Sequence, residues 1–133
     1  MPVEGLSFSG LARSLSISER STAKPPGAKD LRITRQTPLS AQLDGGDRVG
    51  YVVAQQAVEI AIDEAADVGL AVVGANNTWY TGMLSNYAEM ITAKGLVAVI
   101  ASNASPWVTP FGGTEGRFGT NPFCLGFPAP QRP

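Results

Sequence analysis

The sequence predicts an α/β fold in which a mixed sheet is flanked by helices. Residues 49–68 are rich in Ala, Glu and Gln, and their apolar positions recur at the spacing of one helix face. Two continuous apolar runs, 70–75 (LAVVGA) and 96–101 (LVAVIA), are typical of buried strands. A second helical segment, 83–94, separates these two runs. Helices that alternate with apolar strands indicate a layered α/β arrangement.

Before the long helix, the sequence predicts a short helix, a linker and two short strands. The short helix ends near Ser18, and its apolar face consists of Phe8, Leu11, Ala12 and Leu15. Prolines and a glycine among Lys and Ser in residues 18–30 predict a surface linker. Apolar and polar residues alternate in 31–34 and 41–43, which predicts two strands, and 44–46 (DGG) is predicted to be a turn.

The connections after the long helix carry most of the glycine and proline. Gly69 is expected to end the long helix and Gly95 the second one, because glycine readily adopts the left-handed backbone found at helix ends. Residues 76–82 are predicted to form a loop. The segment 102–122 contains four glycines and three prolines and is long for a connection, which indicates a working surface. Residues 123–127 (FCLGF) are predicted to form a further strand.

Composition and charge exclude several classes of function. With 133 residues, 44% hydrophobic and 16% charged, the chain has the composition of a single soluble globular domain. Its net charge of −1 offers no basic surface for nucleic acid. The start lacks a secretory signal and no apolar run is long enough to cross a membrane, so we expect a cytoplasmic protein. One cysteine and no histidine are too few ligands for zinc, and no metal site is expected.

Several segments of the sequence match the motifs of one enzyme family. Residues 110–113 (PFGG), 119–122 (GTNP) and the strand that follows resemble its P-W/F-G-G and G-T-N-P segment, and 103–106 (NASP) resembles its N-S-S-P loop. Residues 40–73 are similar to its strand, D-G turn, helix and strand, and 4–20 resemble its G-x-D-S-H-G-x-x-R segment. The chain therefore resembles the malate/L-lactate dehydrogenase family of NAD(P)-dependent 2-hydroxyacid dehydrogenases.

The resemblance implies a fold and a domain organisation. The fold is the family's own mixed α/β sheet with flanking helices and not a Rossmann fold, and the sequence has no G-x-G-x-x-G after a strand. Residues 1–29 correspond to the end of a helical N-terminal region plus a linker, and 30–133 to the N-terminal part of the NAD(P)-binding domain. Because family members are much longer, we expect a partial domain with an open edge on its last strand and poor solubility when isolated.

The first candidate site residues lie in the segment that resembles S-H-G-x-x-R. The Ser, His and Arg positions of that motif are occupied here by Phe8, Ser9 and Arg13. Ser9 thus stands where the family has a catalytic histidine for proton transfer. Arg13 is positioned to bind the substrate carboxylate, because a guanidinium matches a carboxylate with two hydrogen bonds. The alternative is that Arg13 is a solvated side chain on a short helix.

A second family histidine falls in the 76–82 loop. By resemblance to N-S-x-H-F-G, Tyr80 occupies the histidine position and Thr81 the neighbouring substrate-binding position. A phenol is protonated at neutral pH because its ordinary pKa is about 10, so it can donate a proton without any shift. This favours reduction of a 2-oxoacid or an imine over oxidation. The alternative is that Trp79 and Tyr80 only pack the loop against the sheet.

Cofactor contacts are expected after the strand at 96–101, because ligands of α/β sheets bind beyond the carboxyl ends of strands. The resemblance places Ala104 at a nicotinamide-cofactor contact, where Ser105 supplies a hydroxyl one residue on, and Asn121 shapes the same cleft. Alternatively, Asn121 is a turn residue with positive φ. The resemblance implies NAD or NADP, a small carboxylate substrate and a homodimer in the intact enzyme. The competing interpretations are a catalytically inactive fragment and a binding or interaction module.

Overall fold

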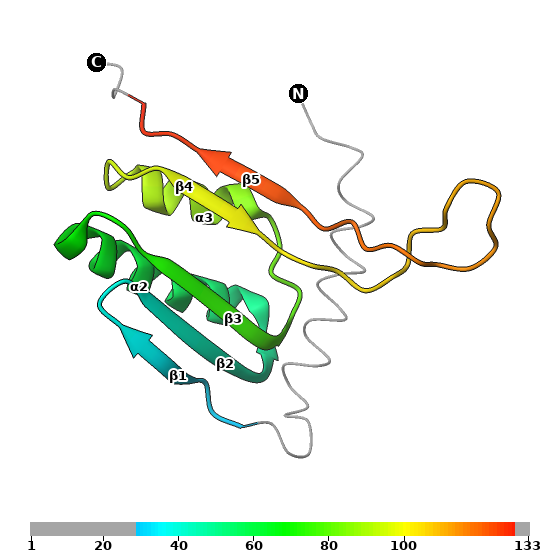
Figure 1. The fold of residues 1–133 in the computed structure, drawn as a ribbon, viewed down its shortest axis with the longest axis horizontal. Coiled ribbons are helices and arrows are strands. Elements are labelled where there is room, and N and C mark those ends of the chain that lie inside the picture. Colours follow the sequence, from blue (N-terminus) through cyan, green and yellow to red (C-terminus); the bar gives the residue numbers. More distant parts are fainter. Residues whose placement is uncertain (1–28, 130–133) are drawn as a thin grey trace, which may run out of the picture.

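The computed structural model describes residues 29–129, which form two small sheets and two helices (Figure 1). In chain order the elements are β1 (Arg32–Thr37), β2 (Ser40–Val49), α2 (Gly50–Val68), β3 (Val72–Trp79), α3 (Leu84–Thr92), β4 (Ala98–Ala101) and β5 (Phe123–Gly126). The expected short helix near Ser18 lies outside the described residues. The predicted alternation of helices and strands is confirmed, and so are the two helices predicted at 49–68 and 83–94.

The first sheet has the order β1-β2-β3, with β1 antiparallel and β3 parallel to β2. Its hairpin turns at residues 38–39, where the Thr37 and Ser40 hydroxyls lie 2.8 Å apart. The predicted turn at residues 44–46 is therefore wrong. These residues lie inside β2, where the register with β3 shifts and both Gly46 and Asp47 have positive φ. A glycine-rich stretch can form a bulge within a strand as readily as a turn.

The second sheet consists of β4 and β5, which pair antiparallel from Ala98–Gly126 to Ala101–Phe123. The strand predictions at 96–101 and 123–127 are thus confirmed with slightly shorter bounds. The 76–82 loop prediction is partly wrong, because β3 continues to Trp79 and pairs with β2 there. The polar residues at 76–78 extend the strand because β2 supplies parallel partners on both sides of its bulge, Asp44 for Asn76 and Arg48 for Thr78.

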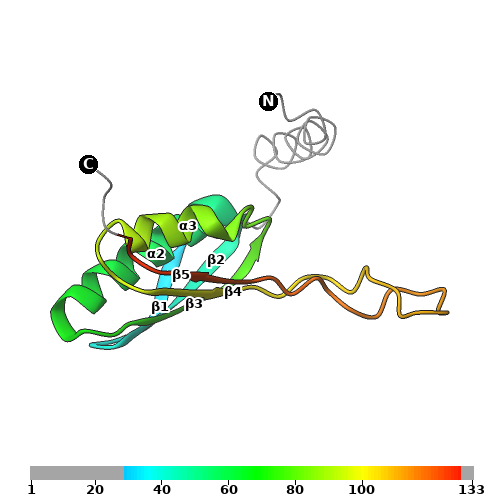
Figure 2. The same ribbon diagram turned by 90° about the horizontal axis from the view of Figure 1, so that it is seen from above.

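Both helices cover the same face of the two sheets (Figure 2). Helix α2 packs over β2 and β3, α3 packs over β4 and β5, and the helices contact each other. Leu43 of β2 and Val53 of α2 are fully buried, and Val58, Leu84 and Tyr87 form a buried cluster between the helices. Full burial of one such aliphatic side chain contributes about 1.5–3 kcal/mol, so this face holds the fold together.

The opposite face of the sheets is apolar and open. Along each strand, the side chains on this open face alternate with side chains that pack against the helices. The open face carries five apolar side chains that are 52–65% exposed: Val72, Val97, Val99, Phe123 and Leu125. The expectation that the strands at 70–75 and 96–101 are buried is thus wrong for one of their two faces in the described part of the chain. Helices cover only one side, and the sequence pattern alone does not distinguish one-sided from two-sided cover.

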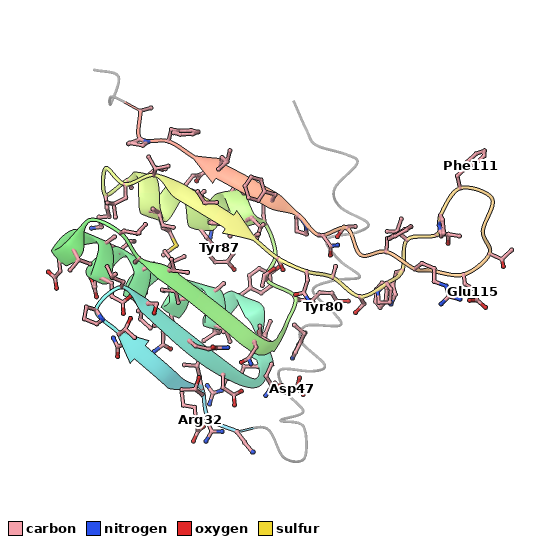
Figure 3. The ribbon with its side chains drawn as sticks, viewed as in Figure 1. Arg32, Asp47, Tyr80, Tyr87, Phe111 and Glu115 are labelled. Atoms are coloured by element: carbon pink, nitrogen blue, oxygen red, sulfur yellow. The ribbon has the colours of Figure 1, made fainter. Side chains whose placement is uncertain are left out.

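A long two-stranded arm, residues 102–122, projects from the β4–β5 sheet (Figures 1 and 2). A bridge between Val108 and Phe118 joins its two sides, with N–H to O distances of 2.7 and 3.0 Å. Phe111 lies fully exposed near its tip (Figure 3). No helix among residues 29–129 is both long and apolar enough to span a membrane.

Candidate active site

The carboxyl ends of β2, β3 and β4 lie at one edge of the molecule (Figure 1). The loop 80–83 follows β3 at this edge, and the arm 102–122 follows β4. Helices α2 and α3 also begin here, and neither has a side-chain cap hydrogen bond. The start of a helix carries partial positive charge, which favours carboxylates and phosphates. This carboxyl edge is therefore the candidate active site, as expected for a layered α/β fold.

Tyr80 begins the loop after β3 in a left-handed backbone conformation, with φ of 53°. Its side chain is 42% exposed, and its ring meets that of Trp79 edge-on at 5.6 Å (Figure 3). The indole Nε1 of Trp79 donates a 2.9 Å hydrogen bond to the carbonyl of Asp47. A bulky residue with positive φ is costly and is held in place only by its surroundings. Trp79 is thus the aromatic that is tied to the sheet, whereas Tyr80 is partly exposed.

The backbone of Thr81 is held by a hydrogen bond from the buried Tyr87 of α3. The Tyr87 hydroxyl donates a 2.6 Å hydrogen bond to the Thr81 carbonyl oxygen, and Tyr87 is 3% exposed. Burial raises the pKa of the Tyr87 hydroxyl above its usual value, and the nearby Tyr51 adds to the rise. Opposite Thr81, a Cβ on Gly50 would lie 2.8 Å from the Thr81 nitrogen. The loop is fixed between the starts of α2 and α3.

Gly82 completes this loop with φ of 76°. A Cβ at Gly82 would lie 2.2 Å from the Tyr51 ring. All three tyrosines of the chain therefore belong to or surround residues 80–82, which we call the tyrosine loop. Sequence reasoning identified Tyr80 but missed Tyr51 and Tyr87. Helical spacing places Tyr87 on the buried face of α3, yet the direction of its hydroxyl depends on tertiary structure.

A carboxylate ties the bulge of β2 to the end of β3. Asp44 Oδ1 accepts hydrogen bonds from Asn77 Nδ2 at 2.9 Å and from the Gly46 N–H at 3.0 Å, and Arg32 lies 3.4 Å from Oδ2. The hydrogen bond from Asn77, followed by that from Gly46, holds the pKa of Asp44 below its usual value. Asn77 has a φ of 50°. This ionised group fixes the backbone just before the tyrosine loop, and sequence reasoning did not identify it.

The expected cofactor residues meet at the base of the arm. Asn121 Oδ1 accepts a 3.0 Å hydrogen bond from the Ala104 N–H, and a Cβ on Gly119 would lie 2.2 Å from the Ala104 carbonyl oxygen. Ser105 is exposed, and its carbonyl accepts a 2.8 Å hydrogen bond from the Trp107 N–H. Asn121 has a φ of 41°, so the positive φ expected for it is confirmed, whereas its contribution to a cofactor cleft stays a prediction. Ala104 and Asn121 are thus adjacent although far apart in sequence.

Two predicted site residues, Ser9 and Arg13, lie outside residues 29–129. Within that range, no group of three His, Cys, Asp or Glu side chains gathers in a way that could hold a metal ion. A shallow hollow between α2 and α3 is lined by Glu59, Ile62, Asp63, Met90 and Lys94. It lies along the middle and far halves of the helices, away from the carboxyl edge, and we do not consider it the site.

Comparison with known protein sequences identifies relatives over most of the chain. The family model "Malate/L-lactate dehydrogenase" matches residues 4–133. The L-sulfolactate dehydrogenase of Methanocaldococcus jannaschii is 35% identical over 98 residues, which cover 74% of this chain and 28% of that protein. The ureidoglycolate dehydrogenase (NAD(+)) of Escherichia coli K12 is 34% identical over 114 residues, 86% of this chain and 31% of that protein. The chain spans less than a third of the length of these curated relatives.

Solved structures show the same arrangement. The malate dehydrogenase of Pyrococcus horikoshii superposes with a TM-score of 0.72 at 34% identity, over 77% of this chain and 30% of that one. The sulfolactate dehydrogenase of Methanocaldococcus jannaschii gives a TM-score of 0.74 at 28% identity, over 91% of this chain and 36% of that one.

Proposed function

Because the chain belongs to the malate/L-lactate dehydrogenase family, we propose that it supplies one wall of the active site of an NAD(P)-dependent oxidoreductase. The substrate class is a small 2-hydroxyacid, the corresponding 2-oxoacid or a related imine. The observation that carries this proposal is that the tyrosine loop and the arm follow β3 and β4 at the same carboxyl edge of the sheets. The rest of the site comes from the part of the family's length that this chain does not span.

Tyr80 is the proton donor in this proposal. Tyr80 is 42% exposed at the carboxyl edge, and its strained backbone is held by the Trp79–Asp47 and Tyr87–Thr81 hydrogen bonds. A neutral phenol that donates its proton to the oxygen or nitrogen of a reacting C=O or C=N group favours reduction. Reduction forms the C–H bond and gives the proton to the heteroatom, so a donor that is protonated beforehand suits this direction.

Substrate binding is assigned to Thr81 and Arg13, with Ser9 at the position of the family's first histidine. The half-buried Thr81 follows the proton donor directly, and its backbone is fixed by Tyr87. The guanidinium of Arg13 pairs with the carboxylate of the substrate. The starts of α2 and α3 at the same edge add partial positive charge for that carboxylate.

The base of the arm fits the amide-bearing nicotinamide end of NAD or NADP. Ser105 offers an exposed hydroxyl, and the contact between Ala104 and Asn121 holds the loop that presents it. The absence of a side chain on Gly119 allows the backbone strands of the arm base to approach closely. When bound, the cofactor would supply or accept the hydride, and residues 103–105 and 121 would hold its nicotinamide end.

The proposal is tested in a chimera that joins this chain to the remaining length of the Methanocaldococcus jannaschii L-sulfolactate dehydrogenase. We expect Tyr80→Phe to lower kcat for 2-oxoacid reduction about 100-fold or more, with little change in KM, because a general acid acts mainly in the transition state. Tyr80→His, which restores the family residue, is expected to keep reduction and to raise oxidation. Unchanged turnover in Tyr80→Phe would remove Tyr80 from the mechanism.

The alternative is a chain without catalysis that serves as an inactive or interaction module. The absence of histidine in the entire chain favours it, because the family's proton-transfer residues are replaced. Fluorescence titration of NADH against the chimera distinguishes the two: saturable binding that Ser105→Ala weakens supports the enzyme, whereas no binding supports the alternative.

By family membership we further propose that residues 30–133 form part of the cofactor domain of a cytoplasmic homodimer. Light scattering of the chimera can check whether it is a dimer.

A further inference from the structure

Three consecutive side chains at the end of β3 donate hydrogen bonds to one short segment of β2. Each bond is 2.9 Å long, and they run from Asn77 Nδ2 to Asp44 Oδ1, from Thr78 Oγ1 to the Arg48 carbonyl and from Trp79 Nε1 to the Asp47 carbonyl. All three acceptors lie where the register of β2 with β3 shifts, in what we call the bulged segment, residues 44–48. Tyr80 follows directly, and Figure 3 shows it at the same end of the sheet as Asp47.

The bulged segment is longer than the part of β3 that it faces. Residues 44 and 48 pair with residues 76 and 78, so three residues of β2 lie opposite the single residue Asn77. Gly46 and Asp47 accommodate the extra length with φ of 60° and 61°. The Asp44 carboxylate closes the segment, because its Oδ1 also accepts the Gly46 N–H at 3.0 Å. One carboxylate oxygen thus bonds to both strands, to Gly46 in β2 and to Asn77 in β3.

Two buried glycines let backbone approach the bulged segment closely from two directions. A Cβ on Gly45 would lie 2.8 Å from the Asn77 carbonyl oxygen, and a Cβ on Gly46 would lie 2.2 Å from the Lys29 carbonyl oxygen. The segment is therefore enclosed by the end of β3 on one side and by the first described residue of the chain on the other. Close packing against backbone leaves it little freedom to move, so it can support the residues that bond to it.

Strained backbone is concentrated in the same place. Among residues 29–129, four residues other than glycine have a positive φ, and three of them are Asp47, Asn77 and Tyr80, with φ of 61°, 50° and 53°. Asp and Asn adopt this conformation more readily than a bulky residue such as tyrosine. A strained conformation persists only where neighbouring contacts hold it. The bonds from the end of β3 to the bulged segment are such contacts on the side of β2.

We propose that Asp44 is a positioning residue for Tyr80: through Asn77 and the bulged segment, its carboxylate sets the backbone from which Tyr80 acts on the substrate. The proposal rests on the proposed function, in which Tyr80 is the proton donor. Asp44 does not touch the substrate. A general acid must lie within hydrogen-bond reach of the atom that it protonates, and a small misplacement lowers the rate. Loss of Asp44 should therefore slow proton transfer more than it weakens substrate binding.

The first test is NMR of the two tryptophan indoles in this chain. The Trp79 indole N–H bonds to the bulged segment, whereas Trp107 in the arm is 80% exposed and serves as the internal reference. Asp44→Ala is expected to speed hydrogen exchange of the Trp79 indole about tenfold and to leave Trp107 unchanged. Asp44→Asn keeps an acceptor oxygen and should retain most of the protection. Unchanged exchange in Asp44→Ala, or equal acceleration in Asp44→Ala and Asp44→Asn, would overturn the proposal.

The second test is kinetic and uses the chimera. Asp44→Ala is expected to lower kcat for 2-oxoacid reduction about tenfold with less than about a twofold change in KM, and Asp44→Asn should restore most of the loss. Asp67→Ala, the same change at an exposed residue near the end of α2, is the control and should leave kcat unchanged.

A double variant shows whether Asp44 acts through Tyr80. In Tyr80→Phe, which has no phenol to position, Asp44→Ala should lower kcat no further. A second tenfold loss in that background would show that Asp44 acts independently of Tyr80, and the proposal would be wrong. If the unsubstituted chimera has no turnover, the proposed function fails, and the indole exchange alone decides whether Asp44 holds the backbone before Tyr80. If it turns over and Asp44→Ala leaves kcat unchanged, the proposed function stands and the positioning role is wrong.

Discussion

The hydroxyl of Tyr87, on the buried face of α3, donates a 2.6 Å hydrogen bond to the carbonyl oxygen of Thr81 in the tyrosine loop. This bond joins the hydrophobic core to the candidate site. Without it, the part-buried Thr81 carbonyl beside the first turn of α3 would lose this partner.

We expect Tyr87→Phe to lower the free energy of unfolding by about 1–2 kcal/mol, because it removes a hydrogen bond while it keeps the ring in place. Urea denaturation of the chain measures this change. Tyr80→Phe is the matched control, since the Tyr80 ring is 42% exposed, and it should leave the unfolding midpoint nearly unchanged. Equal effects of the two substitutions would contradict the assigned role of Tyr87.

Stability should fall in alkaline solution partly through Tyr87. Burial raises the pKa of its hydroxyl in the folded state above the unfolded value, so the folded protein holds the proton more tightly. This contribution is fully present below the unfolded pKa of about 10 and is lost as pH rises through the folded pKa. Denaturation between about pH 9 and pH 11 should show a shallower decline for Tyr87→Phe than for Tyr80→Phe.

Gly82→Ala should destabilise the protein by more than the positive φ of residue 82 alone would cause. Both Gly82 and Gly95 have φ near 76°, but an added Cβ meets the Tyr51 ring only at Gly82, and at Gly95 nothing lies within 4 Å. Gly95→Ala thus measures the backbone cost, about 1 kcal/mol. We expect Gly82→Ala to cost about 1–3 kcal/mol more. Thermal denaturation of both variants gives the difference, and equal melting temperatures would refute the Tyr51 contact.

Asn77→Gly should raise the pKa of Asp44 toward its ordinary value. The substitution keeps a residue that tolerates the φ of 50° and removes the amide that contributes most to the lowered pKa. Because the pKa of Asp44 is lower in the folded than in the unfolded protein, its carboxylate stabilises the fold above the unfolded pKa. This stabilisation is lost as pH falls through the folded pKa. NMR titration of the Asp44 carboxyl carbon measures the shift. Asn76→Ala serves as the control, and a comparable rise there would argue against the Asn77 hydrogen bond as the cause.

The sequence predicted the elements better than it predicted their surroundings. The helix at 50–68 and the strand at 123–126 were found because helical spacing and apolar runs are local properties. The Asp44-Gly45-Gly46 bulge was mistaken for a turn, because glycine permits both and the choice depends on pairing with β3. Likewise, the apolar runs could not reveal that one face of each sheet lies open, since local sequence does not specify what covers a strand.

In the candidate site, too, the sequence predicted the residues but not the tertiary contacts that hold them. The resemblance identified Tyr80, Thr81, Ala104, Ser105 and Asn121, which lie in the loop after β3 and in the arm between β4 and β5. The contacts that hold them, from Tyr87 to Thr81 and from Ala104 to Asn121, join residues whose sequence spacing carries no periodic signal. Their roles in catalysis and binding stay predictions until the variants are measured.

The long arm also affects the order in which the chain can assemble. The β1–β2 hairpin closes across residues 38–39, whereas Ala101 and Phe123 pair across the entire arm from 102 to 122. The entropy lost in closing a loop grows with its length, and the two ends of the arm must be brought together before β4 and β5 gain any hydrogen bonds. Local hairpin and helix contacts form first in such topologies. The base of the arm, where Ala104 meets Asn121, is therefore expected to be among the last parts of the described chain to fold.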